Sequence, residues 1–292
     1  MTPVATVAET LRSAAHALHS HSESPRLDAE LLLGKILGLS RSGLIARSGE
    51  IIAADGERAY ASLIERRLQG APVAYLTGIR EFWSLPLKVT PAVLVPRPET
   101  ELLVELALQL LPNHPTPASA DQVRVLDLGT GSGAIALAIA SERPQARVTG
   151  VDISPEALQV AVQNSRDLGL AHIEWRVGSW FDALPGERFH MILANPPYIA
   201  AADPALDRLT AEPAIALSGG ATGLEAFSAI AAQAPAHLHE GGWLIMEHGS
   251  EQAPDVARLL ERHGFTNIRS HLDFSRRPRV TLGTITPHEE RS

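Results

Sequence analysis

The chain has 292 residues, of which 45% are hydrophobic, and it carries a formal net charge of −8 and no cysteine. Its length allows two domains, and the absence of cysteine excludes disulfides and thiolate metal sites. It has no apolar run long enough to span a membrane, and its first ten residues lack the pattern of a signal peptide, so we expect a cytoplasmic protein without a membrane partner. No histidine falls in a metal-binding spacing, and we expect no metal.

The acidic excess is confined to one part of the chain. Residues 1–75 carry eight basic and eight acidic side chains, so the whole net charge of −8 lies beyond them. Proteins that follow nucleic-acid phosphates usually show the opposite sign where they bind. We therefore expect no direct nucleic-acid partner.

The first 72 residues are predicted to form a helical bundle. Apolar residues recur at helical spacing from Val4 to about Gln69, with Ser/Gly interruptions between four or five short segments. A purely structural cap and a docking surface for a protein partner both remain open for this bundle. Residues 73–95, rich in aromatic and β-branched residues, predict a hairpin that links two domains.

Residues 96–286 are predicted to form the catalytic domain. It begins with a helix over 101–111, and a Pro-rich surface loop over 112–120 is expected to be mobile. A polar tail, residues 287–292, is expected to be disordered.

A glycine-rich loop follows the first apolar strand of this domain. The strand covers residues 123–128, and Asp152 ends the next strand, 19 residues past the last loop glycine. Strand, loop, helix, strand and acid in this order predict a βαβ unit that binds a nucleoside-containing cofactor, with Asp152 on the ribose hydroxyls. The loop residues are Gly129, Thr130, Gly131, Ser132 and Gly133.

The cofactor is predicted to be S-adenosylmethionine. The loop departs from the dinucleotide spacing, and Asp127 with the loop amides suits a ligand that has an ammonium group and a carboxylate. After the third strand, residues 172–177, Trp180 and Phe181 could flank the adenine. Ordinary core packing is the alternative for these two aromatic residues.

The fourth strand, residues 189–193, ends in Asn195-Pro196-Pro197-Tyr198. Two prolines cannot continue a sheet ladder, so the strand stops at the carboxyl edge, where ligands bind in such folds. The turn offers carbonyl and carboxamide oxygens and an aromatic face, which suit a planar substrate with an NH2 group. A plain strand-ending turn is the alternative. Glu247 and His248 follow another buried strand, and we expect this pair to lie away from the chemistry.

The glycine loop and the Asn-Pro-Pro-Tyr turn together resemble those of S-adenosylmethionine-dependent N-methyltransferases. With three further motifs, the chain resembles the HemK/PrmC family of peptide chain release factor N5-glutamine methyltransferases, from about Ala71 to Gly283. The three motifs are Gly78–Trp83, Pro96–Glu101 and Glu247–Gly249.

This resemblance implies an α/β fold of the class I methyltransferase type, a Rossmann-like, mostly parallel sheet with an antiparallel end. It implies that S-adenosylmethionine, which becomes S-adenosylhomocysteine, is bound by residues 129–133 with Asp152, Trp180 and Asn195. The turn would hold the glutamine of the Gly-Gly-Gln motif of class I release factors, while the bundle and hairpin would help dock the release factor. We expect a monomer. The chain departs from the family in a short segment, residues 200–212, and at residues 274–277.

The reaction poses a chemical problem, because an amide nitrogen is a poor nucleophile. We expect the Asn195 carboxamide and the Pro196 carbonyl to accept the two N–H bonds of the target amide, and Tyr198 to clamp its plane. Orientation of this kind can contribute several kcal/mol, on the order of 7 to 11 in ideal cases. The alternatives are an N6-adenine DNA or RNA methyltransferase, which faces the same problem on a flipped base, and a cofactor-binding scaffold without turnover.

Overall fold

The computed structural model describes residues 5–111 and 122–285. It divides into two compact units between Ile79 and Arg80. The predicted mobile loop, residues 112–120, and the predicted tail, residues 287–292, lie outside the described residues. Within the described ranges, no helix is long and apolar enough to cross a membrane.

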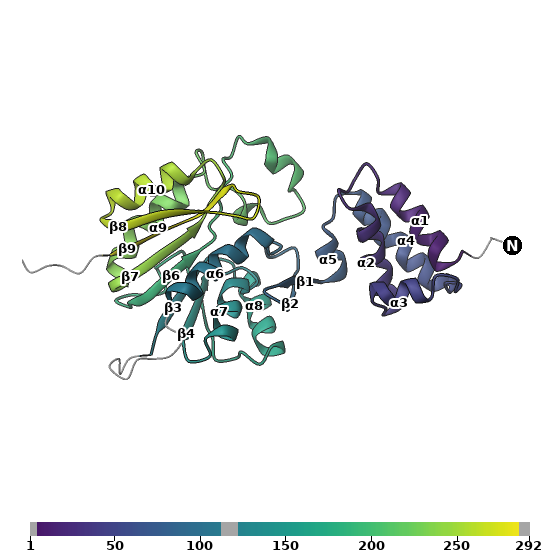
Figure 1. Ribbon diagram of the computed structural model, residues 1–292, viewed down its shortest axis with the longest axis horizontal. Helices are drawn as coiled ribbons and strands as arrows, with labels where there is room; N and C mark the ends of the chain where they lie inside the picture. The colour runs from purple at the N-terminus through teal and green to yellow at the C-terminus, as the bar shows by residue number, and fades with distance from the viewer. Residues whose placement is uncertain (1–4, 112–121, 286–292) are drawn as a thin grey trace, which may run out of the picture. The chain divides into compact units, whose positions relative to one another are not determined.

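The first unit is helical, as Figure 1 shows. Its core packs Leu11, Leu32, Leu33 and Tyr60, all nearly inaccessible to solvent. The Thr6 side chain accepts a hydrogen bond from the backbone N–H of Glu9, and the Glu9 side chain accepts one from the backbone N–H of Thr6. This capping box satisfies amides at the start of the first helix. The helices of this unit are α1 (Val7–Ala17), α2 (Pro25–Leu37), α3 (Arg41–Ala46), α4 (Ala54–Leu68) and α5 (Val73–Thr77).

Helix α5 corrects the prediction that the hairpin begins at residue 73. Its buried Leu76 joins the core of the first unit, and Gly78 ends the helix in a left-handed conformation with φ +82°. The β-branched residues at this position indicated a strand, but packing of Leu76 into the core outweighs their strand preference, which depends strongly on context. The hairpin itself consists of β1 (Ile79–Phe82) and β2 (Leu85–Lys88).

The second unit is built around a seven-stranded sheet with the order β5-β4-β3-β6-β7-β9-β8. The first five strands in this order are parallel, and β9 and β8 add the antiparallel end. The strands are β3 (Arg124–Leu128), β4 (Arg147–Asp152), β5 (Glu174–Val177), β6 (Phe189–Ala194), β7 (Leu238–Glu247), β8 (Phe265–Leu272) and β9 (Pro278–Ile285).

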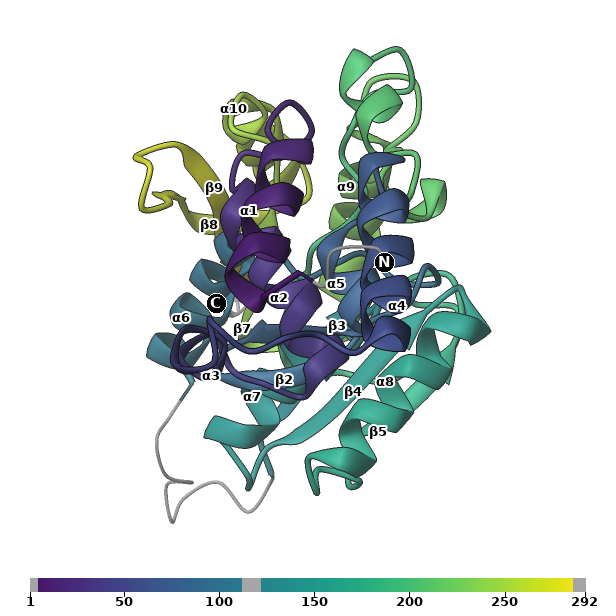
Figure 2. The ribbon, with the colours of Figure 1, turned by 90° about the vertical axis from the view of Figure 1, so that its right-hand side faces the viewer.

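Helices cover both faces of this sheet (Figures 1 and 2). Helices α6, α7 and α8 lie on one face, where α8 packs along β4 and β5, and α9 and α10 lie on the other. Helix α9 is not among the elements predicted from the sequence. The helices are α6 (Glu101–Leu110), α7 (Ala134–Glu142), α8 (Pro155–Asp167), α9 (Glu225–Gln233) and α10 (Ala253–Arg262), with short 3-10 turns η1 (Pro98–Thr100), η2 (Pro204–Arg208), η3 (Ala214–Ala216) and η4 (Ala234–His237).

The strand order reverses between β3 and β6. The chain builds β3, β4 and β5 outward in one direction, then returns to place β6 and β7 on the other side of β3. In open α/β sheets, the loops at the carboxyl ends of strands diverge at such a point and leave a crevice for a ligand. The glycine loop after β3 and the Asn-Pro-Pro-Tyr turn after β6 therefore meet at this crevice.

Candidate active site

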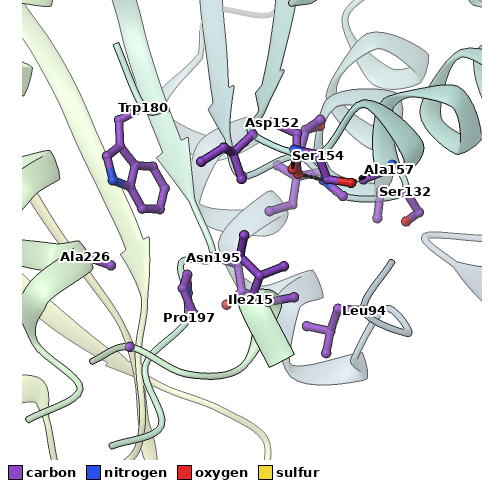
Figure 3. Close-up of a pocket in the computed structure, with 18 of the residues that line it drawn as sticks. Leu94, Ser132, Asp152, Ser154, Ala157, Trp180, Asn195, Pro197, Ile215 and Ala226 are labelled. Atoms are coloured by element: carbon purple, nitrogen blue, oxygen red, sulfur yellow. Dashed lines mark hydrogen bonds between the residues drawn. The ribbon is translucent and has the colours of Figure 1, made fainter. Parts of the chain in front are cut away.

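A cavity of about 440 Å³ opens at this reversal point. Its volume falls within the range of small-molecule and cofactor sites, about 300 to 1,000 Å³. Figure 3 shows Trp180, Asp152, Asn195 and Ile215 around it. The wall thus combines residues of the glycine loop, the ends of β4 and β6, and two loops that the sequence analysis left without a role.

The glycine loop is shaped by its own hydrogen bonds. Gly129, Gly131 and Gly133 have φ values of +69°, +57° and +83°, which other residues rarely adopt. The amides of Gly129 and Thr130 donate to the carbonyl of Val151, and the amide of Gly133 donates to that of Thr130. These three amides therefore maintain the turn itself, and a role of the loop amides toward a carboxylate stays a prediction.

Gly133 is needed for packing. A Cβ atom there would lie 2.9 Å from the Trp175 ring and 3.2 Å from the Ala161 Cβ, and the residue does not line the cavity. Gly129, Thr130, Gly131 and Ser132 line the cavity, and contact of Gly133 with the cofactor stays a prediction.

Asp127 lies beneath the loop, fully buried, and does not line the cavity. Its Oδ2 accepts hydrogen bonds from the Thr130 hydroxyl at 2.6 Å and from the Ala136 amide at 3.2 Å, which join the loop to α7. Burial raises the pKa of Asp127 to about 7, although these two hydrogen bonds lower it. Among the described residues Oδ1 has no hydrogen-bond partner. The structure thus gives Asp127 a role in supporting the loop, and its contact with a cofactor stays a prediction.

Asp152 ends β4 at the cavity wall. Its carboxylate accepts hydrogen bonds from the Gly131 amide at 2.8 Å and from the Ser154 amide at 2.9 Å, so it is held in a fixed orientation. Burial raises its pKa, and these backbone hydrogen bonds oppose the shift. A fixed carboxylate with further acceptor capacity fits the predicted role toward ribose hydroxyls.

Trp180 and Phe181 are separated by the backbone. Trp180 takes a left-handed conformation with φ +48° and lines the cavity. Phe181 is 3% exposed and stacks on His237, with ring centroids 4.5 Å apart. Phe181 thus packs in the core, which was the alternative left open for it, and its contact with the adenine stays a prediction. Trp180 offers an aromatic face to the cavity.

The Asn-Pro-Pro-Tyr turn begins directly after β6, as predicted. Asn195 and Pro197 line the cavity, Pro196 is buried, and Tyr198 packs against the core on the side of α9 and α10. Burial raises the pKa of Tyr198 to about 12. The Gln252 side chain donates to the Tyr198 carbonyl at 3.0 Å and so fixes the end of the turn.

The loop after the turn packs closely against it. A Cβ atom at Gly219 would lie 2.5 Å from the Pro197 carbonyl oxygen, and one at Gly223 would lie 2.5 Å from the Tyr198 carbonyl oxygen. Ile199 pairs with the same loop through an isolated parallel bridge to Ser218. The turn is therefore enclosed by backbone on both sides and has little freedom to shift.

Asn195 is held from behind by polar groups of two other motifs. Its Nδ2 donates to the Thr100 hydroxyl at 3.1 Å. Burial raises the pKa of Glu247 to about 7, and the neighbouring Thr100 and Asn195 side chains oppose this shift. Thr100 is 4% exposed and Glu247 is 1% exposed.

The expectation that Glu247 and His248 lie away from this region is right for one residue and wrong for the other. The His248 ring is buried, with Nδ1 2.8 Å from the Gly249 carbonyl oxygen and Nε2 2.8 Å from the Thr281 hydroxyl, and burial lowers its pKa. It is a neutral structural side chain. Glu247, in contrast, contacts the Asn195 carboxamide.

A signal for Glu247 and Thr100 was present in the sequence. Each belongs to a motif that the family resemblance included, Glu247–Gly249 and Pro96–Glu101. Glu247 also ends a buried strand, as Asp152 does, and parallel strands end at the same sheet edge. The register that pairs Ala194 with Met246 then places Asn195 and Glu247 at adjacent strand ends. Ile215 and Gly219 carried no comparable signal.

A cavity of this size, with a glycine cradle, an oriented carboxylate and one aromatic face at the reversal point of the sheet, fits S-adenosylmethionine. The fold and the site define a class I S-adenosylmethionine-dependent methyltransferase. The chain matches the PrmC N-terminal domain over residues 9–78 and a methyltransferase domain over residues 119–270. It belongs to the family of release factor glutamine methyltransferases, and its similarity to curated members extends over most of its length.

The similarity to two members and to one solved structure is as follows. The release factor glutamine methyltransferase of Xylella fastidiosa (strain Temecula1) is 48% identical over 260 residues, which cover 88% of this chain and 92% of that protein. The Escherichia coli (strain K12) protein of the same name is 42% identical over 275 residues, 94% of this chain and 96% of its own. A methyltransferase from Pyrococcus furiosus shares the fold at a TM-score of 0.52 and 16% identity, over 78% of this chain and all of that one.

Proposed function

We propose that this chain methylates the side-chain amide nitrogen, N5, of the glutamine in the Gly-Gly-Gln motif of peptide chain release factors. Family membership supports the substrate, and one observation in the site supports the chemistry. The Asn195 amide nitrogen is engaged by Thr100, which leaves the carboxamide oxygen as the group to meet a substrate N–H. An acceptor oriented in this way is what a primary amide requires.

When bound, S-adenosylmethionine would supply an electrophilic methyl group to the substrate nitrogen, with S-adenosylhomocysteine and a proton as the other products. Gly129, Gly131, Asp152 and Trp180 would hold it, since all four line the cavity.

The residues of the turn act on the substrate amide. In our proposal Asn195 Oδ1 and the Pro196 carbonyl accept its two N–H groups, which raises electron density on the nitrogen and directs its lone pair toward the methyl carbon. Tyr198 limits movement of the amide plane. Orientation is the main contribution of these groups, because the amide proton becomes acidic only as the methyl group is transferred.

The remaining partner assignments follow from charge and from the substrate. The formal net charge of −8 supports a protein substrate over a nucleic acid. We propose a monomer that acts in the cytoplasm. We also propose that the bundle of the first unit and the β1–β2 hairpin help dock the release factor; Ile45 and Ile51, 69% and 65% exposed, are apolar groups available for such a contact.

A methyl-transfer assay with labelled S-adenosylmethionine tests the proposal. The acceptors are a release factor, the same factor with its Gly-Gly-Gln glutamine replaced by alanine, and DNA. We expect label only on the release factor that keeps its Gly-Gly-Gln glutamine. Label on DNA, or labelling of the factor that survives the glutamine replacement, would overturn the assignment in favour of another acceptor.

A further inference from the structure

We propose that Glu247 is a positioning residue that fixes the orientation of the Asn195 carboxamide, so that its oxygen faces the substrate and its nitrogen faces the protein. The catalytic consequence of this inference rests on the proposed function, because it concerns how the same site presents its acceptor. The orientation itself is a property of the protein alone.

Three segments far apart in the sequence meet behind Asn195. Adjacent strands β6 and β7 pair Ala194 with Met246, which brings Asn195 and Glu247 together at the carboxyl edge. Thr100, at the end of η1, completes the group and receives the Asn195 Nδ2 hydrogen bond. All three side chains belong to the second unit, so their arrangement does not depend on the placement of the helical bundle.

The donor and acceptor capacities then decide the orientation. The Thr100 oxygen accepts from Asn195 Nδ2, and its own hydroxyl hydrogen is available for the Glu247 carboxylate. An ionised carboxylate only accepts, so Asn195 must also face it through Nδ2. A flipped carboxamide would turn its oxygen toward the carboxylate, and the low dielectric of this buried site makes that contact unfavourable.

The charged groups around Glu247 come from each neighbouring element. The positive charge of Arg279 on β9 favours ionised Glu247, and the negative charge of Glu99 on η1 opposes it. Together with burial, the charge of Glu247 in turn raises the pKa of the Tyr198 phenol in the turn. His248, next in sequence, has a pKa lowered by burial and so stays neutral near pH 7. Burial outweighs the favourable contacts and raises the pKa of Glu247 to about 7. Protonated Glu247 has a donor hydrogen and can pair with either face of the carboxamide, so the orientation is fixed only when Glu247 is ionised.

The position of Glu247 argues against a direct role as a base. Asn195 and Thr100 line the cavity and Glu247 does not. Its carboxylate therefore acts through Asn195. One of its oxygens, Oε2, has no hydrogen-bond partner among the described residues.

The first test measures activity in the full-length enzyme. Glu247→Gln keeps the shape but can pair with either face of the carboxamide, and Glu251→Gln is a matched control at an exposed position four residues away. For Glu247→Gln we expect kcat to fall about 10-fold to 100-fold, because misorientation costs rate, with cofactor Kd within about threefold. The rise of activity with pH near 7 should disappear in Glu247→Gln and persist in Glu251→Gln. Thr100→Val should reproduce the loss and Thr100→Ser should restore it.

The second test does not depend on turnover. The side-chain 1H–15N signals of Asn195 are followed by NMR from about pH 5.5 to pH 8.5 in the wild type and in Glu247→Gln. We expect a transition near pH 7 in the wild type that is absent in the variant. Signals that do not respond to pH in the wild type, or that titrate equally in Glu247→Gln, would overturn the inference. Failure of the wild type to methylate a release factor would instead contradict the proposed function, and the NMR result would still decide the orientation.

Discussion

The carboxylate of Glu212 accepts a hydrogen bond from the backbone N–H of Val95 at 3.0 Å, across 117 residues of sequence. The same carboxylate pairs with Arg97, and Glu212 is 7% exposed. This contact ties the loop that carries Ile215 to the segment that carries Leu94, and both line the cavity. Segment 200–212 thus ends in a residue that holds part of the cavity wall.

Glu212→Ala is expected to loosen this wall. The Val95 amide loses its acceptor and Arg97 loses its partner, which should lower the free energy of unfolding by about 1 to 3 kcal/mol. Hydrogen exchange at Val95 should become faster than in Asp207→Ala, an exposed control in the same loop. Unchanged protection of Val95 would show that the contact does not hold the segment.

Trp180→Ala should weaken cofactor binding, and Phe181→Ala should instead lower the stability of the fold. Loss of an aromatic stacking face costs about 1 to 3 kcal/mol, so Trp180→Ala should raise the Kd for S-adenosylmethionine about 5-fold to 150-fold in calorimetry. Phe181→Ala should lower the free energy of unfolding by about 3 to 5 kcal/mol, with cofactor affinity close to wild type in the folded protein. The reverse pattern would return Phe181 to the cofactor site.

Gly219→Ala should move the Asn-Pro-Pro-Tyr turn. The new Cβ would lie 2.5 Å from the Pro197 carbonyl oxygen and 2.9 Å from the Tyr198 Cα, so backbone must shift. A displacement of this kind near reacting groups can cost about 100-fold in rate. We expect a fall in kcat in single-turnover assays, whereas Gly49→Ala, which places its Cβ in open space, should match the wild type. Equal rates in the two variants would mean that the turn tolerates displacement.

Asn195→Ala removes the proposed acceptor of a substrate N–H. We expect most of kcat to be lost while cofactor binding survives at least in part, because the glycine loop, Asp152 and Trp180 remain. Single-turnover kinetics together with calorimetric titration of the cofactor distinguish the two effects. Turnover near the wild-type rate would remove Asn195 from the mechanism.

The buried carboxylates predict how stability depends on pH. Burial raises the pKa of Glu247 from 4.5 and of Asp127 from 3.8, each to about 7 in the folded protein. At a pH between the ordinary pKa of each group and its raised pKa of about 7, the folded state binds more protons than the unfolded state. The contribution of each group to stability therefore falls as the pH rises through this range. Denaturant titrations should therefore show Glu247→Gln gaining stability over the wild type from pH 5 to pH 8, by at most about 3 kcal/mol. Glu251→Gln should show no such trend, and a constant difference for Glu247→Gln would contradict the raised pKa.

Local sequence patterns predicted much of the fold. The glycine loop, Asp152 and the double proline each follow an apolar strand, and they lie where that order predicts, at the carboxyl edge of a mostly parallel sheet. Such features depend on neighbours in the sequence, so one chain is enough to find them. Helix α5 was missed because Leu76 packs into the bundle core, a tertiary contact that outweighs strand propensity.

The parts of the site that escaped prediction depend on contacts across the chain. Trp180 and Phe181 look equivalent as a dipeptide, and only the left-handed backbone at Trp180 sends one to the cavity and the other to the core. The contact of Glu247 with Asn195 requires the pairing of β6 with β7, which the order of strands along the chain does not state. Long-range pairing, and not residue type, limited the sequence analysis.

The central claim is the identity of the methylated atom. Tandem mass spectrometry of a release factor incubated with the enzyme and S-adenosylmethionine tests it most directly, with the Asn195→Ala enzyme as a control. We predict one added methyl group on the glutamine of the Gly-Gly-Gln peptide, located on the side-chain nitrogen, and almost none with the variant. A methyl group on another residue, or an unmodified glutamine after full incubation with the wild-type enzyme, would contradict the assignment.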